Sequence, residues 1–314
     1  MDFIDVAIIG GGPAGLTAAN TLARQVHTAV LYDNSSYRNA GANHMHMVLT
    51  WDHKSPEEYR SASRKNILEN YSTIQFADVS VSKIEKKSDS HFEVHDSNGG
   101  VRNFRKVILA VGSADEYPSI EGYGKFWKKR IFHCLFCHGY EDRGAASAGV
   151  LAVPPVAGGL AAHMAQNAAQ LAEKVVLYTN GDDAVTSELQ PIVSTLVQSK
   201  FSIETRKIKQ LVEGESADSV TVEFEDGTSK SEKFLVHNPK TTAQGPFVAQ
   251  LGLATTPLGD IQADGPFYAT SVPGVYAVGD CSTPYKVIPS SITSGCNAAV
   301  AVSAEIQAAK YTQS

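Results

Sequence analysis

The chain is poor in cysteine, in charge of one sign and in long apolar runs. Four cysteines among 314 residues are too few for a disulfide-stapled scaffold and favour a reducing, cytoplasmic compartment. Lys and Arg number 27 against 33 Asp and Glu, and this balance argues against nucleic acid or an anionic membrane as partner. No apolar run approaches the roughly 20 residues of a membrane helix. The first strand pattern begins by Phe3 or Ile4 and leaves no room for a signal peptide.

Hydrophobic periodicity predicts two similar halves. Each half contains a βαβ unit followed by short alternating segments typical of an antiparallel meander. The expected βαβ elements are strand 4–10, helix 13–24 and strand 29–32, then strand 149–153, helix 160–172 and strand 175–178. Meanders are expected over 75–108 and 201–237, and residues 107–112 are expected to form a buried strand that ends in glycine and closes the first segment.

This duplication predicts an α/β fold with two dinucleotide-binding, Rossmann-like domains, the second inserted in the first. The expected bounds are 1–115 with 242–314 for the outer domain and 116–241 for the inserted one.

The N-terminal glycine turn has the context that a dinucleotide site requires. Gly10-x-Gly12-x-x-Gly15 follows a strand and opens a helix, whose positive end meets a pyrophosphate. Asp33 ends the next strand, 23 positions after Gly10, where a carboxylate can accept hydrogen bonds from a ribose.

A second segment favours FAD over NAD. The run from Thr270 to Asp280 resembles the second flavin motif of flavoproteins with two dinucleotide-binding domains, and Ser294-Gly295-Cys296 looks like the start of a helix whose dipole faces the flavin. The residues expected to bind FAD are Gly10, Gly12, Pro13, Ala14, Gly15, Asp33, Arg38, Asn39, Ala110, Gly112, Gly279, Asp280, Ser294, Gly295 and Cys296.

A dithiol motif lies between the two halves of the chain. Cys134 and Cys137 are spaced as a redox pair, and a helix N-terminus at this place would lower a thiol pKa. His133 and His138 flank the pair and are candidate proton acceptors. A zinc site would need a second cysteine pair, but Cys281 and Cys296 each fall within a flavin motif, so no metal is expected.

The glycine turn expected in the second βαβ unit is damaged. Aligning its helix places Val156 where the first glycine should stand, and a β-branched residue resists a positive φ. The loop after the next strand, Thr179 to Asp183, is acidic and lacks the arginines that hold an NADPH 2′-phosphate.

These motifs resemble the thioredoxin reductase superfamily over nearly the whole chain. Within it, the segment from His133 to Asp142 more closely resembles the fungal dithiol oxidases of gliotoxin-type biosynthesis, which close a disulfide and pass electrons through FAD to O2. Thioredoxin reductases carry Asp after the second cysteine, where this chain has His138. The resemblance implies that Cys134 exchanges with substrate, that Cys137 faces the flavin, and that the protein is a homodimer.

The expected function is therefore oxidation of a small-molecule dithiol by FAD, with O2 as acceptor and His138 as the base. Two alternatives remain open at this point. One is an NADPH-dependent disulfide reductase of the thioredoxin reductase type, and the other is a flavin-bound redox sensor without turnover.

The loop from Asn43 to His53 is a candidate substrate contact. It follows the first βαβ unit at the carboxyl edge of the sheet, where ligands bind in open α/β folds. His44, His46 and Trp51 are the side chains expected to contact the dithiol. The alternative is an ordinary surface loop with Trp51 buried.

Overall fold

The computed structural model describes residues 3–214, 216 and 218–312. The chain forms two compact units, one of Met1–Ala114 with Thr241–Ser314 and one of Asp115–Lys240. Two hydrogen-bonded strands, β7 (Ser113–Glu116) and β16 (Lys240–Ala243), carry the chain out of the first unit and back. Each unit is built around a parallel sheet, and the predicted α/β class is confirmed.

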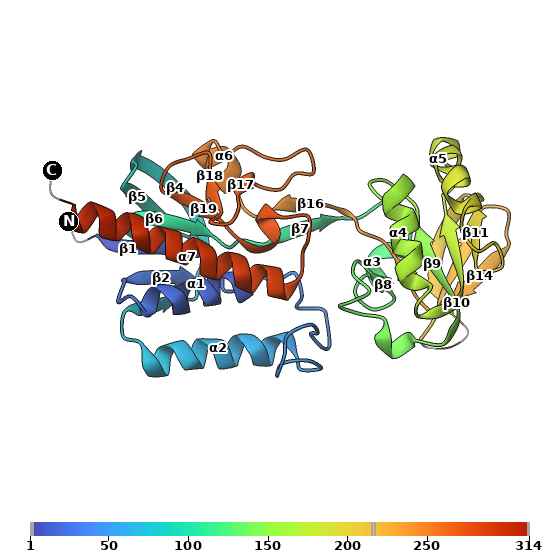
Figure 1. Cartoon of the computed structure of the whole chain (residues 1–314), viewed down its shortest axis with the longest axis horizontal. Coiled ribbons are helices and arrows are strands. Elements are labelled where there is room, and N and C mark those ends of the chain that lie inside the picture. Colours follow the sequence, from blue (N-terminus) through green and yellow to red (C-terminus); the bar gives the residue numbers. More distant parts are fainter. Residues whose placement is uncertain (1–2, 215, 217, 313–314) are drawn as a thin grey trace. The chain divides into compact units, whose positions relative to one another are not determined.

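The first unit contains a parallel sheet in the order β19-β6-β1-β2-β3 (Figure 1). These strands are β1 (Ile4–Ile9), β2 (Ala29–Tyr32), β3 (Ile74–Ala77), β6 (Val101–Leu109) and β19 (Val275–Ala277). The short strands β17 (Ala263–Asp264) and β18 (Ala269–Thr270) continue it antiparallel beyond β19.

The predicted buried strand over 107–112 is present only as far as Leu109. Its apolar residues form the second half of β6, whose first half pairs antiparallel with β5 (His91–Asp96), and β5 pairs with β4 (Val81–Ser88). One strand thus belongs to both the meander and the parallel sheet, because its pairing partner changes along its length.

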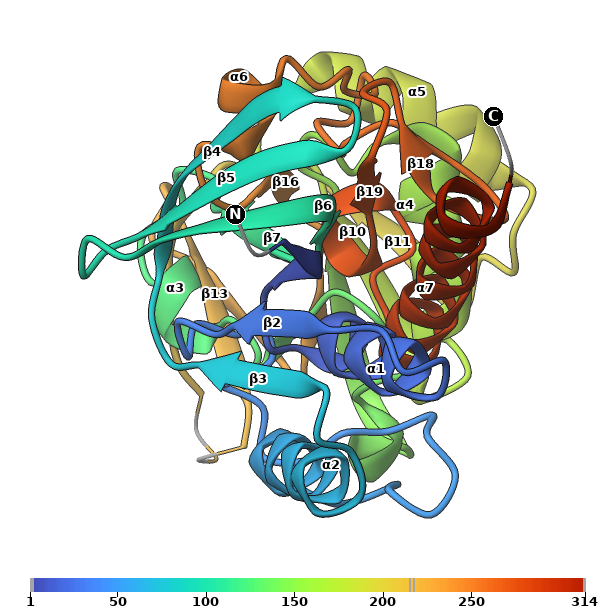
Figure 2. The same ribbon diagram turned by 90° about the vertical axis from the view of Figure 1, so that its left-hand side faces the viewer.

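The first sheet is buried on both faces. Val6 and Ile8 of β1 pack with α1 (Pro13–Ala23) and α7 (Ile288–Tyr311), which lie side by side on one face (Figure 2). Ala7 and Ile9 face the meander and α6 (Phe247–Leu251). Strict alternation along β1 therefore supplies two cores, as expected for a parallel sheet covered on both sides. Helix α2 (Pro56–Asn70) begins at Ser55, whose side chain accepts a hydrogen bond from Glu58 N.

The second unit repeats this plan on a smaller scale. Its parallel sheet runs β11-β10-β9-β15-β8, and a separate antiparallel sheet contains β12, β13 and β14. The strands are β8 (Ile131–Phe132), β9 (Ala145–Leu151), β10 (Ala172–Tyr178), β11 (Phe201–Glu204), β12 (Ile208–Glu213), β13 (Val220–Phe224), β14 (Ser229–Glu232) and β15 (Leu235–Val236).

Helices cover one face of this sheet. Val175 and Leu177 of β10 pack towards α4 (Gly158–Ala168) and α5 (Asp183–Ser194), whereas Val176 and Tyr178 pack towards the antiparallel sheet and α3 (Tyr123–Phe126). Several bounds differ from the prediction. Strand β9 spans Ala145–Leu151 rather than 149–153, α4 spans Gly158–Ala168 rather than 160–172, and β10 begins at Ala172 rather than 175. Strands β3 and β11 each join a parallel sheet instead of a meander. No helix among the described residues is long and apolar enough to cross a membrane.

Candidate functional site

The first βα turn depends on glycine at two positions. Gly10 has φ +116°, and a Cβ there would lie 2.2 Å from the Ala110 carbonyl oxygen. A Cβ on Gly15 would lie 2.0 Å from the Gly10 carbonyl oxygen. Both residues are needed because the helix start packs directly on the strand ends β1 and β6.

Gly12 is different, because a Cβ there would meet nothing within 4 Å. It is the N-cap of α1 and supplies no side-chain acceptor to the first-turn N–H groups. These N–H groups and the positive end of the helix dipole therefore face open space. That arrangement fits the pyrophosphate of a dinucleotide.

The two predicted flavin motifs meet where α1 and α7 cross. A Cβ on Gly295 would lie 2.2 Å from the Ala14 carbonyl oxygen, and one on Gly279 would lie 3.0 Å from the Ala14 Cβ. Gly279 N donates a hydrogen bond of 2.9 Å to Ser294 Oγ. Small residues thus bring together segments from opposite ends of the chain.

The predicted helix start at Ser294-Gly295-Cys296 is wrong. Helix α7 already begins at Ile288, with Val287 as N-cap and proline in its first turn. Ser294 lies about two turns inside the helix and supports Gly279 through its hydroxyl group. The sequence reading missed this start because the Ile-Pro pair precedes a polar stretch without apolar periodicity.

Asp280 is held from several sides. Its carboxylate lies 3.4 Å from Arg38 Nη1 and accepts a hydrogen bond of 3.4 Å from Ser291 Oγ. Its backbone carbonyl accepts hydrogen bonds of 2.7 Å from Ser113 Oγ and from Lys286 Nζ. The Lys286 ammonium also pairs with the buried Asp260 carboxylate at 2.6 Å. Asp280 is therefore positioned to bind polar groups of a cofactor.

Asp33 and Asn39 lie near the end of β2. The buried Asp33 carboxylate accepts hydrogen bonds from Ser35 N at 2.9 Å and from Tyr37 Oη at 2.6 Å. Burial, with the Asp33 carboxylate adding to it, raises the pKa of Tyr37 to about 12, so the phenol remains a donor. Asn39 Oδ1 accepts from Arg60 Nη1 at 3.1 Å. The residues around this turn fit the adenosine half of FAD, and their binding roles stay predictions.

Cys134 and Cys137 form a disulfide with their Cα atoms 5.3 Å apart. They lie in a hydrogen-bonded turn, where His138 N donates to Cys134 O at 3.1 Å, and not at the predicted helix N-terminus. Gly139 follows with φ +104° and ends the turn, which prevents a helix from continuing. Cys137 N also donates to Cys134 Sγ at 3.2 Å, so a main-chain N–H, rather than a helix dipole, stabilises negative charge on that sulfur.

The two flanking imidazoles have aromatic neighbours. The His138 ring stacks on buried Phe132 with centroids 5.3 Å apart, and the His133 ring lies 6.0 Å from the Trp127 ring. Both histidines are half-buried. The stacked contact restricts the orientation of the His138 ring more tightly than the tilted contact restricts that of His133, which suits a proton acceptor of fixed position.

The second βα turn differs in length and content. Residues 10–12 connect strand to helix in the first unit, whereas residues 152–157 do so in the second. Ala152 N donates to Tyr178 O as Gly10 N donates to Tyr32 O, so Ala152, and not the predicted Val156, is equivalent to Gly10. Val156 is instead fully buried inside the longer loop.

One carboxylate, that of Glu188, lies beside the start of the helix that follows this loop. Gly158, the first residue of α4, lies so close to Glu188 that a Cβ on it would meet Glu188 Oε1 at 2.0 Å. An anion of the protein thus occupies the end of the helix that would attract a phosphate. Asp182 caps α5, and the one nearby arginine, Arg206, pairs with Glu204 and Asp226.

The predicted substrate loop lies at the surface. His44 is exposed, and Trp51 is half-buried with its ring 5.5 Å from that of Tyr59. His46 approaches Asp52 and His53 instead of standing alone. The contact of His44, His46 and Trp51 with substrate stays a prediction.

Several positioning residues were absent from the sequence prediction. They are Ser113, Ser291, Lys286 and Asp260 around Asp280, Glu188 at α4, and Asp142, whose carboxylate pairs with Arg130 Nη1 at 3.0 Å. Only Lys286 could have been noticed in the sequence, because it is the one charged residue in the stretch 281–304. The others acquire a role only through contacts with distant segments.

Comparison with known proteins gives a consistent result. The profile of the family "Pyridine nucleotide-disulphide oxidoreductase" matches residues 4–301. The chain is 44% identical over 305 residues to "Thioredoxin reductase aclD" of Aspergillus oryzae, covering 96% of each chain. It is 40% identical to "Thioredoxin reductase sirT" of Leptosphaeria maculans, covering 94% of this chain and 91% of the relative. A solved oxidoreductase from Agrobacterium tumefaciens is 31% identical with a TM-score of 0.85, covering 98% of this chain and 99% of that one.

Proposed function

Since the chain belongs to the pyridine nucleotide-disulphide oxidoreductase family, which makes it an oxidoreductase of the thioredoxin reductase type, we propose that it is an FAD-dependent dithiol oxidase. Its substrate would be a small-molecule dithiol of natural-product biosynthesis, and its electron acceptor O2. The observation that carries the proposal is the difference between the two βα turns. Neither helix has a side-chain cap, but the first leaves open space beside its N-cap Gly12, whereas the second places the Glu188 carboxylate beside Gly158, the first residue of its helix.

FAD would be held by the first turn and by Asp33, Arg38 and Asp280. When bound, it supplies a two-electron acceptor for the reduced dithiol and a donor to O2. The protein provides position, polar contacts and control of protons.

The dithiol chemistry follows from thiol–disulfide exchange. One substrate thiolate attacks Cys134 Sγ, the Cys134–Cys137 bond breaks, and Cys137 leaves as the thiolate. The second substrate thiolate attacks the first substrate sulfur, releases Cys134 as the thiolate and closes the substrate disulfide. Two protons leave the substrate thiols, and we assign His138 as the first acceptor. The two cysteine thiolates then re-form the Cys134–Cys137 bond, and the two electrons they give up would be accepted by bound FAD and finally by O2, which with the two protons would become H2O2.

The hydrogen bond from Cys137 N supports the role of Cys134. In the second step negative charge develops on Cys134 Sγ, which is the atom that this N–H contacts at 3.2 Å. A donor at that position stabilises the departing thiolate and makes it a better leaving group.

A disulfide reductase that uses NADPH is the second candidate. The names of the two fungal relatives favour it, because both are called thioredoxin reductases. The length of the second turn and the Glu188 carboxylate beside the following helix weigh against it.

Anaerobic titration of the flavin-loaded protein separates the candidates. We expect dithiothreitol to bleach the flavin at about one equivalent and an excess of NADPH to leave it oxidised. Admitting air should then restore the colour and yield one H2O2 per dithiol. Rapid bleaching by NADPH would establish the reductase instead, and failure to turn over any dithiol with O2 would leave a redox sensor.

A further inference from the structure

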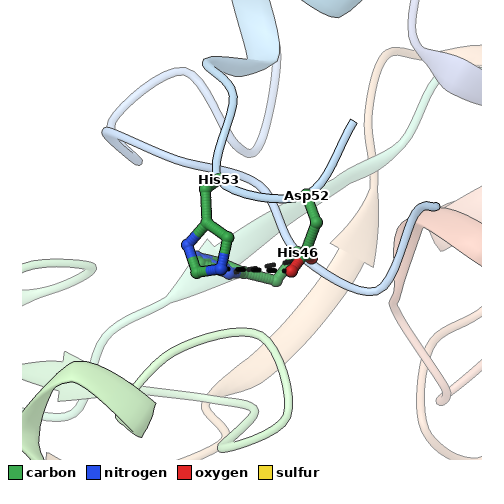
Figure 3. Close-up of side chains that lie close together, drawn as sticks. All are labelled: His46, Asp52 and His53. Atoms are coloured by element: carbon green, nitrogen blue, oxygen red, sulfur yellow. Dashed lines mark ion pairs between the residues drawn. The ribbon is translucent and has the colours of Figure 1, made fainter. Parts of the chain in front are cut away.

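The loop from Met45 to Lys54 gathers three metal-ligating side chains. His46 Nδ1 lies 3.9 Å from Asp52 Oδ1, and His53 Nε2 lies 3.3 Å from Asp52 Oδ2. The potential ligand atoms of all three residues lie within 4.8 Å of one another. Figure 3 shows both imidazoles directed towards the Asp52 carboxylate.

These separations match the coordination shell of a small cation. Two ligands about 2.0–2.1 Å from a tetrahedral zinc ion are about 3.3 Å apart. The His53–Asp52 distance already has this value, and the His46–Asp52 distance needs only a small adjustment. Two imidazoles and one carboxylate also form a known donor set for zinc, in which a fourth position remains for water.

The backbone of the loop holds the three residues together. Met45 N donates to Lys54 O at 2.8 Å and His53 N donates to Met45 O at 3.0 Å, so the two ends of the loop are joined. Met47 N donates to Asp52 Oδ1 at 2.9 Å and orients the carboxylate, as outer hydrogen bonds do at metal sites. His53 adopts φ +63°, a conformation that costs free energy for a non-glycine residue.

A second cluster in the same unit shows what a non-metal site looks like. Glu85, Glu93 and His95 also bring three ligand atoms together. Lys87 Nζ, however, pairs with Glu85 at 2.5 Å and with Glu93 at 2.9 Å, and Lys83 Nζ pairs with Glu85. Ammonium groups therefore already neutralise those carboxylates, whereas the ion pairs of Asp52 are with the two imidazoles.

We propose that His46, Asp52 and His53 form a binding site for one Zn²⁺ ion, with the fourth position open to solvent. Side-chain exposures of 12%, 48% and 64% for these residues place one histidine inside and leave an open path for the ion from the other side. Bound zinc would join the two ends of the loop and stabilise its backbone. The proposal does not rest on the proposed oxidase activity, and because His46 is also a predicted substrate contact, zinc binding is measured apart from turnover.

The test is calorimetric titration of the full-length, flavin-loaded protein with Zn²⁺ in buffer without reductant, so that the Cys134–Cys137 disulfide stays closed. We expect one ion per chain, and the same stoichiometry in a Cys134→Ala/Cys137→Ala background, which excludes the dithiol as the ligand. Cobalt(II) alone should give the visible d–d absorption of a four-coordinate site.

Single substitutions His46→Asn, Asp52→Asn and His53→Asn should each weaken Zn²⁺ binding at least tenfold. His44→Asn, a change in the same loop outside the cluster, and His95→Gln, in the neutralised cluster, should leave the affinity within twofold. Absence of binding, or equal binding by the three cluster variants, would overturn the proposal, whatever the outcome for dithiol oxidation.

Discussion

The two βα turns of this protein begin alike and then diverge. In both, the first residue after the strand donates its N–H to the end of the neighbouring strand, from Gly10 to Tyr32 and from Ala152 to Tyr178. The first turn then reaches its helix after residues 10–12 and leaves the helix N-terminus open, whereas the second needs residues 152–157. The same sheet architecture thus carries a turn with an open helix N-terminus, the proposed pyrophosphate site, in one unit and a longer loop filled by its own side chains in the other.

The second loop is filled and held by the protein's own groups. Val156 fills the core, and His237 Nε2 donates to Val153 O at 3.1 Å. Glu188 supplies the negative charge that a helix N-terminus favours. Four predictions test this difference, in decreasing order of expected effect.

Gly12→Val should abolish retention of FAD, with affinity falling more than 100-fold, because the new side chain fills the space at the helix N-terminus. The free energy of unfolding of the apoprotein should change by only about 1 kcal/mol, since the added Cβ meets nothing. Flavin absorbance after gel filtration measures retention. Ala157→Val, at the N-cap of α4, is the matched control and should keep its colour. A yellow Gly12→Val protein would contradict the assigned cradle.

Gly10→Ala should destabilise the first unit by about 3 kcal/mol or more, because φ +116° and the Ala110 carbonyl oxygen both exclude a Cβ. Urea unfolding followed by circular dichroism gives the change. Gly158→Ala is the corresponding test in the second unit. There φ is +46°, which costs an alanine about 1–2 kcal/mol, and the neighbour is only the end of the exposed Glu188 side chain, which can move, so a loss of about 1–2 kcal/mol is expected. Equal losses would remove the distinction between the turns.

The second turn should weaken in acid. Burial lowers the pKa of His237 from 6.5 to about 4, since its ring lies in the core between Tyr123 Oη and Val153 O. The unfolded chain takes up a proton below pH 6.5 while the folded one resists until about pH 4. Stability is therefore full above pH 6.5 and falls as the pH drops to 4, by about 3 kcal/mol.

Urea midpoints between pH 7 and 4 measure this effect. The slope of stability against pH should become shallower in His237→Phe and stay unchanged in His163→Gln, an exposed histidine of α4. A slope that His237→Phe leaves intact would show that other groups carry the acid sensitivity.

Glu188→Gln should have the smallest effect. Removing one charge from the α4 N-terminus changes anion affinity by about 0.3–1 kcal/mol, so NADPH binding should improve less than about fivefold. The flavin should remain oxidised in the presence of NADPH, because the longer loop is unaltered. Rapid flavin reduction in this variant would mean that charge alone separates the two turns.

Some of this architecture could be predicted from residue order because its causes are local. The first turn and α1 follow from glycine spacing and a proline at the helix start, and both were assigned nearly to the residue. The expected helix start at Ser294 and the expected helix at the dithiol are wrong. Pro289 lies in the first turn of a helix that starts earlier, Gly139 ends the turn at the dithiol, and apolar periodicity indicates neither.

The sequence by itself determined the α/β class, the two βαβ units and the residue types at the dithiol, because hydrophobic period and glycine conformations act within a few residues. Only the tertiary structure decided that Ala152 stands where Gly10 does, that Glu188 covers the α4 N-terminus, and that His46 and His53 converge on Asp52. These relations depend on backbone hydrogen bonds and side-chain contacts between separate segments, and a local sequence pattern does not indicate which distant group will be in contact.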